Sequence, residues 1–241
     1  MMKFVLDSHT HTIASGHAYN TIREMVIAAK EKGLELLAIT DHGPKMTGAF
    51  SEFYFVNFGA VEKNRFGVEL LLGSEVNIMD FDGTVDLNDN ILKKLDVVIA
   101  SLHLPCIDPG TKEENTRAYL NAMKNPYVNI IGHPDDSNFP VDFEALVLGA
   151  KENNVLLELN NSSLNPDNYR RNTKENDIEM LHLCKKYNVP IVVGSDAHAD
   201  SAVGEHDLAL EVINIVDFPV DLIANCSLKM FKKYTNKYKF S

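Results

Sequence analysis

The stretch KFVLDSHTH, residues 3–11, joins a short apolar run to two histidines, His9 and His11. A continuous apolar run bounded by polar residues is typical of a strand that is buried on both faces of a parallel sheet. Side chains two residues apart lie on the same side of a strand, so His9 and His11 face the same space. The stretch therefore predicts a buried strand that ends in a pair of metal-capable imidazoles.

Six further apolar runs of this kind follow: LELLAITDH (34–42), VELLLGSEV (68–76), LDVVIASLH (95–103), VNIIGH (128–133), VLLELNNS (155–162) and PIVVGSDAH (190–198). Between most of them lie stretches with helical patterning, at 21–32, 113–124, 142–153, 174–187 and 205–215. Strands that alternate with helices predict βαβ units and a wound α/β fold rather than a sandwich. The Asp82-Gly83 dipeptide predicts a small hairpin after the third strand.

Length, composition and charge narrow the class of protein. A chain of 241 residues with 45% hydrophobic content is long enough for one sizeable core, so we expect a single domain. The start of the chain lacks the features of a secretory signal, and no apolar run approaches the roughly 20 residues of a membrane span. A net charge of −11 disfavours a nucleic-acid-binding surface. We therefore expect a soluble, cytoplasmic protein that binds neither membranes nor nucleic acid, and homo-oligomerisation is left open.

Two minor features of the composition lead to expectations of their own. The three cysteines are too few and too far apart for a disulfide framework or a paired-thiolate zinc motif. The basic stretch KMFKKYTNKYK, residues 229–239, is expected to form a solvated helix face.

Nearly every apolar run ends in a metal-capable side chain, and in an α/β barrel these ends meet on one face. With one histidine from the loop ASGHAYN (14–20), the set is His9, His11, His17, His42, Glu75, His103, His133, Asp196 and His198. Imidazoles and carboxylates without cysteine suit zinc, manganese or iron. Because nine ligands exceed the needs of one or two ions, the count predicts three divalent ions, zinc being the first choice. Four nearby candidates stay outside the set: His182, His206 and the loop residues Asp135 and Asp136.

The motifs DSHTHT, ITDHG, GSEVN, ASLH, GHP and GSDAH resemble, in order and over essentially the whole chain, those of the PHP (polymerase and histidinol phosphatase) superfamily. The chain looks most like the small stand-alone YcdX-type phosphatases. The resemblance implies a distorted (β/α)7 TIM-like barrel over residues 1–241 with a trinuclear metal centre. It implies one ion on His9, His11, Glu75 and Asp196, a second on Glu75, His103 and His133, and a third on His17, His42 and His198.

The predicted reaction is hydrolysis of a small phosphate monoester, in which a hydroxide shared by two ions attacks phosphorus. Glu75, Asp196 and His198 are the ligands that we also assign to catalysis. Three alternatives remain open: hydrolysis of a carbon–nitrogen or carbon–oxygen bond in the manner of amidohydrolases, a metal-binding regulatory module without turnover, and a phosphodiesterase or nuclease role.

Five further residues are predicted to support the site. Arg170, in YRRNTKEN (169–176), is expected to bind phosphate, the alternative being an exposed basic turn. Asn160 and Asn161 end a strand at the same face and are expected to line the pocket, the alternative being capping of the next segment. Asp7 and Asp41 are expected to orient ligating imidazoles by accepting their second ring N–H, the alternative being strand-end or turn carboxylates.

Overall fold

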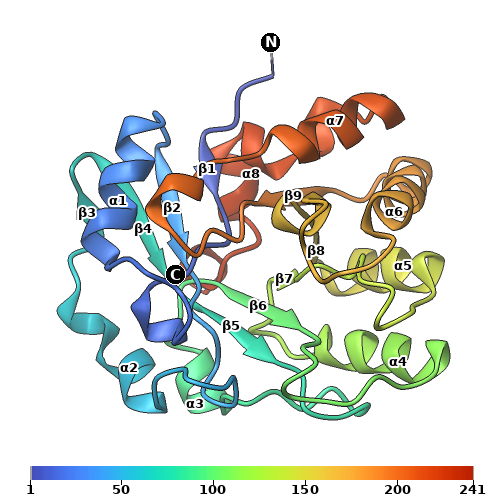
Figure 1. The fold of residues 1–241 in the computed structure, drawn as a ribbon, viewed down its shortest axis with the longest axis horizontal. Coiled ribbons are helices and arrows are strands. Elements are labelled where there is room, and N and C mark those ends of the chain that lie inside the picture. The colour runs from blue at the N-terminus through green and yellow to red at the C-terminus, as the bar shows by residue number, and fades with distance from the viewer. Residues whose placement is uncertain (1, 241) are drawn as a thin grey trace.

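The computed structural model describes residues 2–240 and places strands at the centre of the molecule with helices around them (Figure 1). One sheet has the order β1–β2–β4–β3 and the other the order β5–β6–β7–β8–β9, and every pair is parallel except β3 with β4. The strands are β1 (Leu6–Asp7), β2 (Leu36–Ile39), β3 (Asn64–Arg65), β4 (Val68–Leu72), β5 (Ser74–Asn77), β6 (Val98–Ser101), β7 (Ile130–Ile131), β8 (Leu156–Asn160) and β9 (Ile191–Gly194).

The two sheets join into a distorted barrel. Only Gly73 separates β4 from β5, so these two segments form one bent strand, and an isolated bridge from His42 to Glu75 links the end of β2 to β5. On the other side, the N–H of Asp196 donates to the carbonyl of His9 over 2.9 Å, which links the end of β9 to the end of β1. With β4 and β5 counted as one, seven parallel strands surround the axis. The predicted strands and the (β/α)7 class of fold are confirmed.

The long helices lie where their patterning predicted them, to within two residues at each end: α1 (Ile22–Glu31), α4 (Lys112–Ala122), α5 (Phe143–Asn153), α6 (Thr173–Tyr187) and α7 (Asp207–Val216). Local sequence explains where two of them begin. Thr21 caps α1 and Thr111 caps α4, and in each case a glutamate three residues on completes a capping box. These starts are therefore encoded within four residues of sequence.

The remaining helices are short. They are α2 (Glu52–Val56), α3 (Asp89–Leu92), α8 (Leu228–Lys232) and α9 (Asn236–Lys239), with 3-10 turns η1 (Ile13–Ser15), η2 (Asn57–Ala60), η3 (Ser162–Leu164), η4 (Asp200–Ala202), η5 (Val220–Leu222) and η6 (Ala224–Cys226). The predicted hairpin is present between β5 and α3, where the N–H of Met79 donates to the carbonyl of Thr84 over 2.8 Å. None of the helices within residues 2–240 is long and apolar enough to cross a membrane.

Apolar side chains fill the molecule in two layers, one between strands and helices and one inside the barrel. The inner layer consists of Leu6, Leu36, Ala38, Leu71, Val97, Ile99, Ile130, Leu156, Val192, Ala224 and Phe231. Phe231 belongs to α8 and is fully buried among the first residues of the strands, so α8 closes the N-terminal end of the barrel. The expectation that residues 229–239 form a solvated helix face holds for Lys229, Lys233 and Lys239, which are exposed. It fails for Phe231, which fills the end of the barrel interior. The opposite end stays polar.

Candidate metal centre

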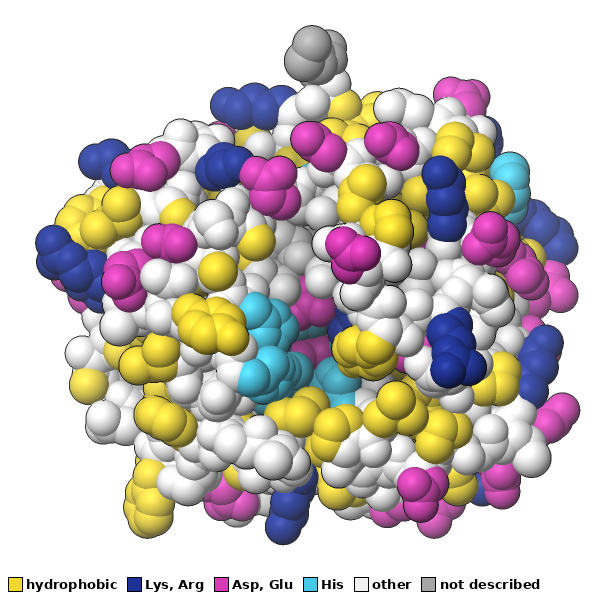
Figure 2. Space-filling model, viewed as in Figure 1, with side chains coloured by type: hydrophobic (Ala, Val, Ile, Leu, Met, Phe, Trp, Pro, Cys, Tyr) yellow, Lys and Arg dark blue, Asp and Glu magenta, His cyan; other side chains and the backbone are white. Residues whose placement is uncertain are grey.

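The structure brings all nine predicted ligands to the C-terminal end of the barrel. Glu75 lies within β5, and the other eight follow β1, η1, β2, β6, β7 and β9. Figure 2 shows histidine side chains gathered in a hollow near the middle of this face, with acidic side chains behind them. Seven of the nine side chains are buried, and only His17 and His198 are partly open to the outside.

Glu75 stands at the centre of the cluster, and each of its carboxylate oxygens faces a different set of imidazoles. Its Oε1 lies 2.8 Å from Nε2 of His133 and 3.2 Å from Nε2 of His103. Its Oε2 lies 2.7 Å from Nδ1 of His42 and 3.4 Å from Nε2 of His9. One carboxylate is therefore placed to serve two neighbouring cations.

Asp196 and the two histidines of the first motif form a second group. Oδ1 of Asp196 lies 3.2 Å from Nε2 of His11 and 3.6 Å from Nε2 of His9. The two Nε2 atoms of His9 and His11 face each other at 2.9 Å. Nε2 of His17 and Nε2 of His198 make a similar approach at 3.0 Å. Two imidazole nitrogens that approach each other with their lone pairs repel, unless a cation or a proton lies between them.

Several buried nitrogen and oxygen atoms of the cluster lack hydrogen bonds, as is expected of atoms that bind metal ions. Nδ1 of His42, Oε2 of Glu75 and Nε2 of His103 are buried, and although they lie close to one another they form no aligned hydrogen bond with any described residue. Each unsatisfied buried atom costs on the order of 1–3 kcal/mol. These three residues form a group whose ligand atoms lie within 4.8 Å of one another, and two similar groups adjoin it. Imidazole nitrogens and carboxylate oxygens together suit a divalent transition metal.

The electrostatics of the cluster agree with this donor set. Burial lowers the pKa of His11 well below its ordinary value, and the neighbouring His198 and His42 add to the effect. Burial also lowers the pKa of His103. Burial works against ionisation of Glu75, but the surrounding imidazoles hold the pKa of that carboxyl well below its usual range. His9 differs: burial disfavours its charged form, but the carboxylates of Glu158, Glu75 and Asp196 raise the pKa of its ring well above the ordinary value. The carboxylates therefore favour a positive charge at this point of the cluster, which a bound cation would supply in place of a proton.

Two of these residues have an uncommon backbone conformation. His133 has a φ of 27° and Asp196 a φ of 55°, in the left-handed region that non-glycine residues seldom adopt. Both lie just beyond a strand end. The left-handed turn directs their side chains into the cluster, and strain of this kind concentrates at functional sites.

Glu158, which the sequence analysis did not single out, is the main support of the cluster. It is fully buried in β8, and its Oε1 lies 2.7 Å from Nδ1 of His9. Its Oε2 accepts a hydrogen bond from the backbone N–H of His133 over 2.9 Å. Gly194 leaves room for this carboxylate, since a Cβ at that position would lie 2.1 Å from Oε1 of Glu158. The sequence feature that could have identified Glu158 is its position as the one carboxylate in the otherwise apolar run VLLEL, residues 155–159.

Asn77 plays a similar part on β5. It lies two residues after Glu75, and its Oδ1 is 2.8 Å from Nδ1 of His103. This contact leaves Nε2 of His103 as the nitrogen that faces Glu75. The signal in the sequence was the spacing of two residues along one strand, which places both side chains on the same side.

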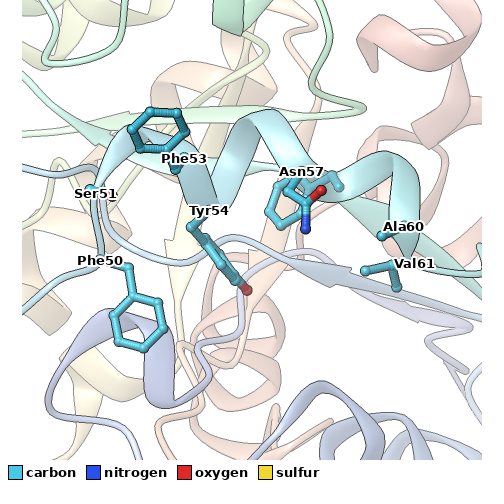
Figure 3. Close-up of a pocket in the computed structure, with 8 residues that line it drawn as sticks. Phe50, Ser51, Phe53, Tyr54, Asn57, Ala60 and Val61 are labelled. Carbon is cyan, nitrogen blue, oxygen red and sulfur yellow. The ribbon is translucent and has the colours of Figure 1, made fainter.

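The structure gives Asp41 an indirect contact with a ligand. Its carboxylate accepts hydrogen bonds from the hydroxyls of Ser15 and Tyr54, each over 2.7 Å. Oγ of Ser15 in turn lies 3.0 Å from Nδ1 of His11. Asp41 thus reaches an imidazole through Ser15, whereas the sequence analysis expected a direct bond. Tyr54 comes from α2 and is among the side chains drawn in Figure 3.

Asp7 does not bond to a ligating imidazole, contrary to the expectation from the sequence. The Asp7 carboxylate accepts hydrogen bonds from the backbone N–H of Ser195 over 3.1 Å and of Gly204 over 2.9 Å. It also lies 3.6 Å from Nε2 of His206, a buried histidine left outside the predicted set. The chain that follows β9 brings these partners nearer to Asp7 than the ligand rings are. Asp7 therefore anchors that chain segment beside Asp196.

Arg170 lies inside the site, so the alternative of an exposed basic turn is ruled out. Both of its Nη atoms lie 3.2 Å from Oδ2 of Asp196. Its Nη1 also donates to Oγ of Ser163 over 2.9 Å and to Oδ1 of Asn160 over 3.3 Å. The guanidinium is held next to the candidate ligands, where it can meet an anion.

The two neighbouring asparagines have different surroundings. Asn160 donates to Oδ2 of Asp196 over 3.3 Å and so lies at the cluster. Asn161 accepts a hydrogen bond from the N–H of Ala209 over 3.0 Å, in the first turn of α7. Asn160 is the last residue of β8, whereas Asn161 already has helical backbone angles at the start of η3, so the two side chains leave the chain in different directions. Asn161 nevertheless lines a hollow beside the cluster that Asp196 and His198 also line, although its side-chain oxygen is taken up by α7.

Asp135, expected to be a plain loop residue, is fully buried. Its Oδ1 accepts a hydrogen bond from Oγ of Ser163 over 3.3 Å, which connects it to Arg170 through that hydroxyl. Burial raises the pKa of Asp135 to about 7. Burial and the nearby Asp135 raise the pKa of Asp177 well above its usual range. A pair of buried carboxyl groups thus lies next to the site.

Three comparisons with known proteins bear on this site. A family model described as the PHP domain matches residues 7–214. A probable phosphatase of Clostridium novyi (strain NT) is 48% identical over 233 residues, which cover 97% of this chain and 95% of that one. A probable phosphatase of Acetivibrio thermocellus is 45% identical over 238 residues, which cover 99% and 98%.

The comparison with solved structures concerns the fold. The histidinol phosphate phosphatase of Lactococcus lactis subsp. lactis, in complex with zinc, L-histidinol and phosphate, matches with a TM-score of 0.59 at 18% identity. The match covers 89% of this chain and 94% of that one. At this identity the likeness supports the architecture of the barrel.

Proposed function

Because the chain belongs to the PHP domain family, we propose that it is a metal-dependent phosphatase that hydrolyses a small phosphate monoester at a centre of three divalent ions. The class of reaction is supported by relatives that share almost half of their residues with this chain and are named probable phosphatases. The donor chemistry suits zinc first, with manganese or iron as the other choices.

One observation carries this proposal. Three buried atoms without hydrogen-bond partners, on His42, Glu75 and His103, converge in a cluster that also contains three other histidines within 4 Å of Glu75. Such an arrangement would destabilise an ordinary protein core, because the buried nitrogen and oxygen atoms lose their hydrogen bonds to water and gain none in return. Divalent cations would remove this penalty.

The proposed division of ligands agrees with one observed group, His9, His11 and Asp196, whereas the other two groups combine His42 with Glu75 and His103, and His11 with His42 and His198. Glu75 is shared between a first ion, with His9, His11 and Asp196, and a second ion, with His103 and His133. The third ion is assigned to His17, His42 and His198. Divalent ions bound here would acidify water and neutralise the charge of the phosphoryl oxygens.

The other side chains would position the substrate and the ligands. Arg170 presents both Nη atoms at the edge of the cluster and would hold the phosphoryl group by paired hydrogen bonds. Glu158 keeps His9 oriented, and Asn77 does the same for His103. Glu75, Asp196 and His198 are the residues whose loss should abolish turnover most completely.

The test combines metal content with phosphate release. Metal-depleted protein is reloaded with zinc or manganese, the bound metal is measured by elemental analysis, and release of phosphate from p-nitrophenyl phosphate is followed. We expect about three ions per chain, metal-dependent release, and loss of both in His9→Ala. His182→Ala, at an exposed position on α6, is the matched control and should retain both.

Other outcomes would decide against the proposal. Metal binding with hydrolysis of amide or lactone substrates, but of no phosphate ester, would favour the amidohydrolase-like alternative. Metal binding without turnover of any substrate would favour a regulatory module. Normal turnover in His9→Ala would refute the ligand assignment itself.

A further inference from the structure

The pocket above the metal cluster has a polar floor and apolar walls. It has a volume of about 460 Å³, in the range of sites for small molecules. Imidazoles and Asp196 form its floor, and Met46, Leu104, Pro105 and Tyr169 form part of its walls. In Figure 2, hydrophobic side chains stand around the hollow that contains the histidines.

The apolar wall residues come from separate loops that share only this pocket. Met46 follows β2, Leu104 follows β6 and Tyr169 follows η3. Leu104 is 43% exposed and Tyr169 is 59% exposed. Exposed apolar groups that gather around a concave polar site are typical of a surface that contacts a ligand.

The charges around the pocket limit the kind of substrate. Among the described residues that line it, Arg170 is the single cationic side chain and is already paired with Asp196. A second phosphate or a carboxylate on the substrate would lie against the apolar surface of Leu104 or Tyr169 and would lose part of its water there without gaining a cationic partner. Such desolvation is unfavourable.

Tyr169 has a geometry that suits a flat group. Its ring centroid lies 5.6 Å from Cζ of Arg170, so the ring stands beside the guanidinium proposed to hold the phosphoryl group. A planar group attached to a phosphate held by Arg170 would be within reach of this ring. Offset or edge-to-face contacts between aromatic rings are favourable.

We propose, resting on the phosphatase function above, that the natural substrate is a phosphate monoester whose alcohol carries a neutral apolar or aromatic group. Tyr169 and Leu104 select this group, and the same walls disfavour substrates with a second negative charge.

The test uses esters that differ only beyond the reacting group. Metal-loaded wild-type protein is assayed with 2-phenylethyl phosphate, ethyl phosphate and 2-phosphoglycolate, all of which are esters of alkyl alcohols. We expect kcat/KM for 2-phenylethyl phosphate to exceed that for ethyl phosphate about tenfold or more, because a phenyl ring is buried. 2-Phosphoglycolate, with its added carboxylate, should be the poorest substrate.

Variants of the wall residues test whether Tyr169 and Leu104 cause the preference for the phenylethyl ester. Tyr169→Ala and Leu104→Ala should each lower the ratio of kcat/KM for the phenylethyl ester to that for the ethyl ester about fivefold to tenfold. Tyr169→Phe, which keeps the ring, should preserve the ratio. Phe53→Ala is the matched control, because Phe53 is 82% exposed and lines a separate apolar hollow beside α2 (Figure 3), so the ratio should stay unchanged.

The possible failures are distinguishable. Hydrolysis of the three esters at similar rates, or equal ratios in wild type and both alanine variants, would overturn this inference and leave the phosphatase proposal standing. A preference for 2-phosphoglycolate would do the same. Absence of hydrolysis of every ester by folded, metal-loaded protein would overturn both.

Discussion

A single buried carboxylate, Glu158, fixes the position of two candidate ligands. It contacts the ring of His9 through one oxygen and the backbone of His133 through the other. Glu158→Gln keeps the shape of the side chain but removes its charge, so we expect metal affinity or kcat/KM to fall about 10- to 100-fold with normal circular dichroism. Glu175→Gln, at an exposed position on α6, is the control. Unchanged metal affinity and turnover would show that the bond to His9 is dispensable.

Arg170 and Arg171 are adjacent but differ in their surroundings, so together they make a matched test. Arg170 faces Asp196 with both Nη atoms, whereas the side chain of Arg171 is exposed. Arg170→Lys replaces a planar fork with a point charge. We expect kcat/KM for a phosphate monoester to fall ten- to a hundredfold, equivalent to about 1.5–3 kcal/mol, mainly through KM. Arg171→Lys should have no effect, and an equal loss in both variants would argue against phosphate binding by Arg170.

Among the elements, α8 and α9 depend on one glutamate of β4. Glu69 lies 2.7 Å from Nζ of Lys232 and of Lys237, and Tyr238 also bonds to it. Burial alone would raise the pKa of Glu69, but these partners lower it to about 2, from 4.5. The pairs thus stabilise the fold fully above pH 4.5, and their contribution is lost as pH falls from 4.5 towards 2.

The corresponding prediction is that Glu69→Gln lowers the free energy of unfolding by about 1 kcal/mol at pH 7, a value that allows for solvent screening of the pairs. The difference from wild type should shrink as pH falls below 4.5. Urea unfolding of both proteins at pH 7 and at pH 3.5 to 4 checks it. Glu31→Gln, at an exposed position at the end of α1, is the control. A difference that grows on acidification would contradict the assignment.

At the scale of the whole molecule, the cluster joins strands from both sheets, so its ligands should govern stability as well as activity. Each ion that binds only the folded state, at a thousand times its Kd, stabilises that state by about 4 kcal/mol. For a chain of this length that corresponds to a rise in Tm of about 8–16 °C. We therefore expect chelation to lower Tm by at least this one-site amount in calorimetry, and zinc or manganese to restore it. His103→Ala should reduce the shift while His182→Ala retains it, and equal Tm with and without bound metal would contradict the prediction.

The sequence by itself determined the order of the elements and the set of chemically capable side chains. Apolar runs that alternate with helical stretches are typical of the central strands of a wound sheet, and the carboxyl ends of such strands meet. This reasoning predicted that His9, Glu75, His103 and Asp196 would lie together, as they do. Capping residues such as Thr21 and Thr111 act within four residues, so helix starts were also legible.

Only the tertiary structure decided which residues contact and orient those side chains. His9 and Glu158 are 149 positions apart, and their contact depends on how β8 and β9 stand next to β1 in the closed barrel. The same holds for the pairing of Asp7 with His206 and for the burial of Phe231 under the barrel. Periodicity fixes the side of a strand on which a residue lies. Its neighbours there come from elements far away in the sequence, and only packing brings them into contact.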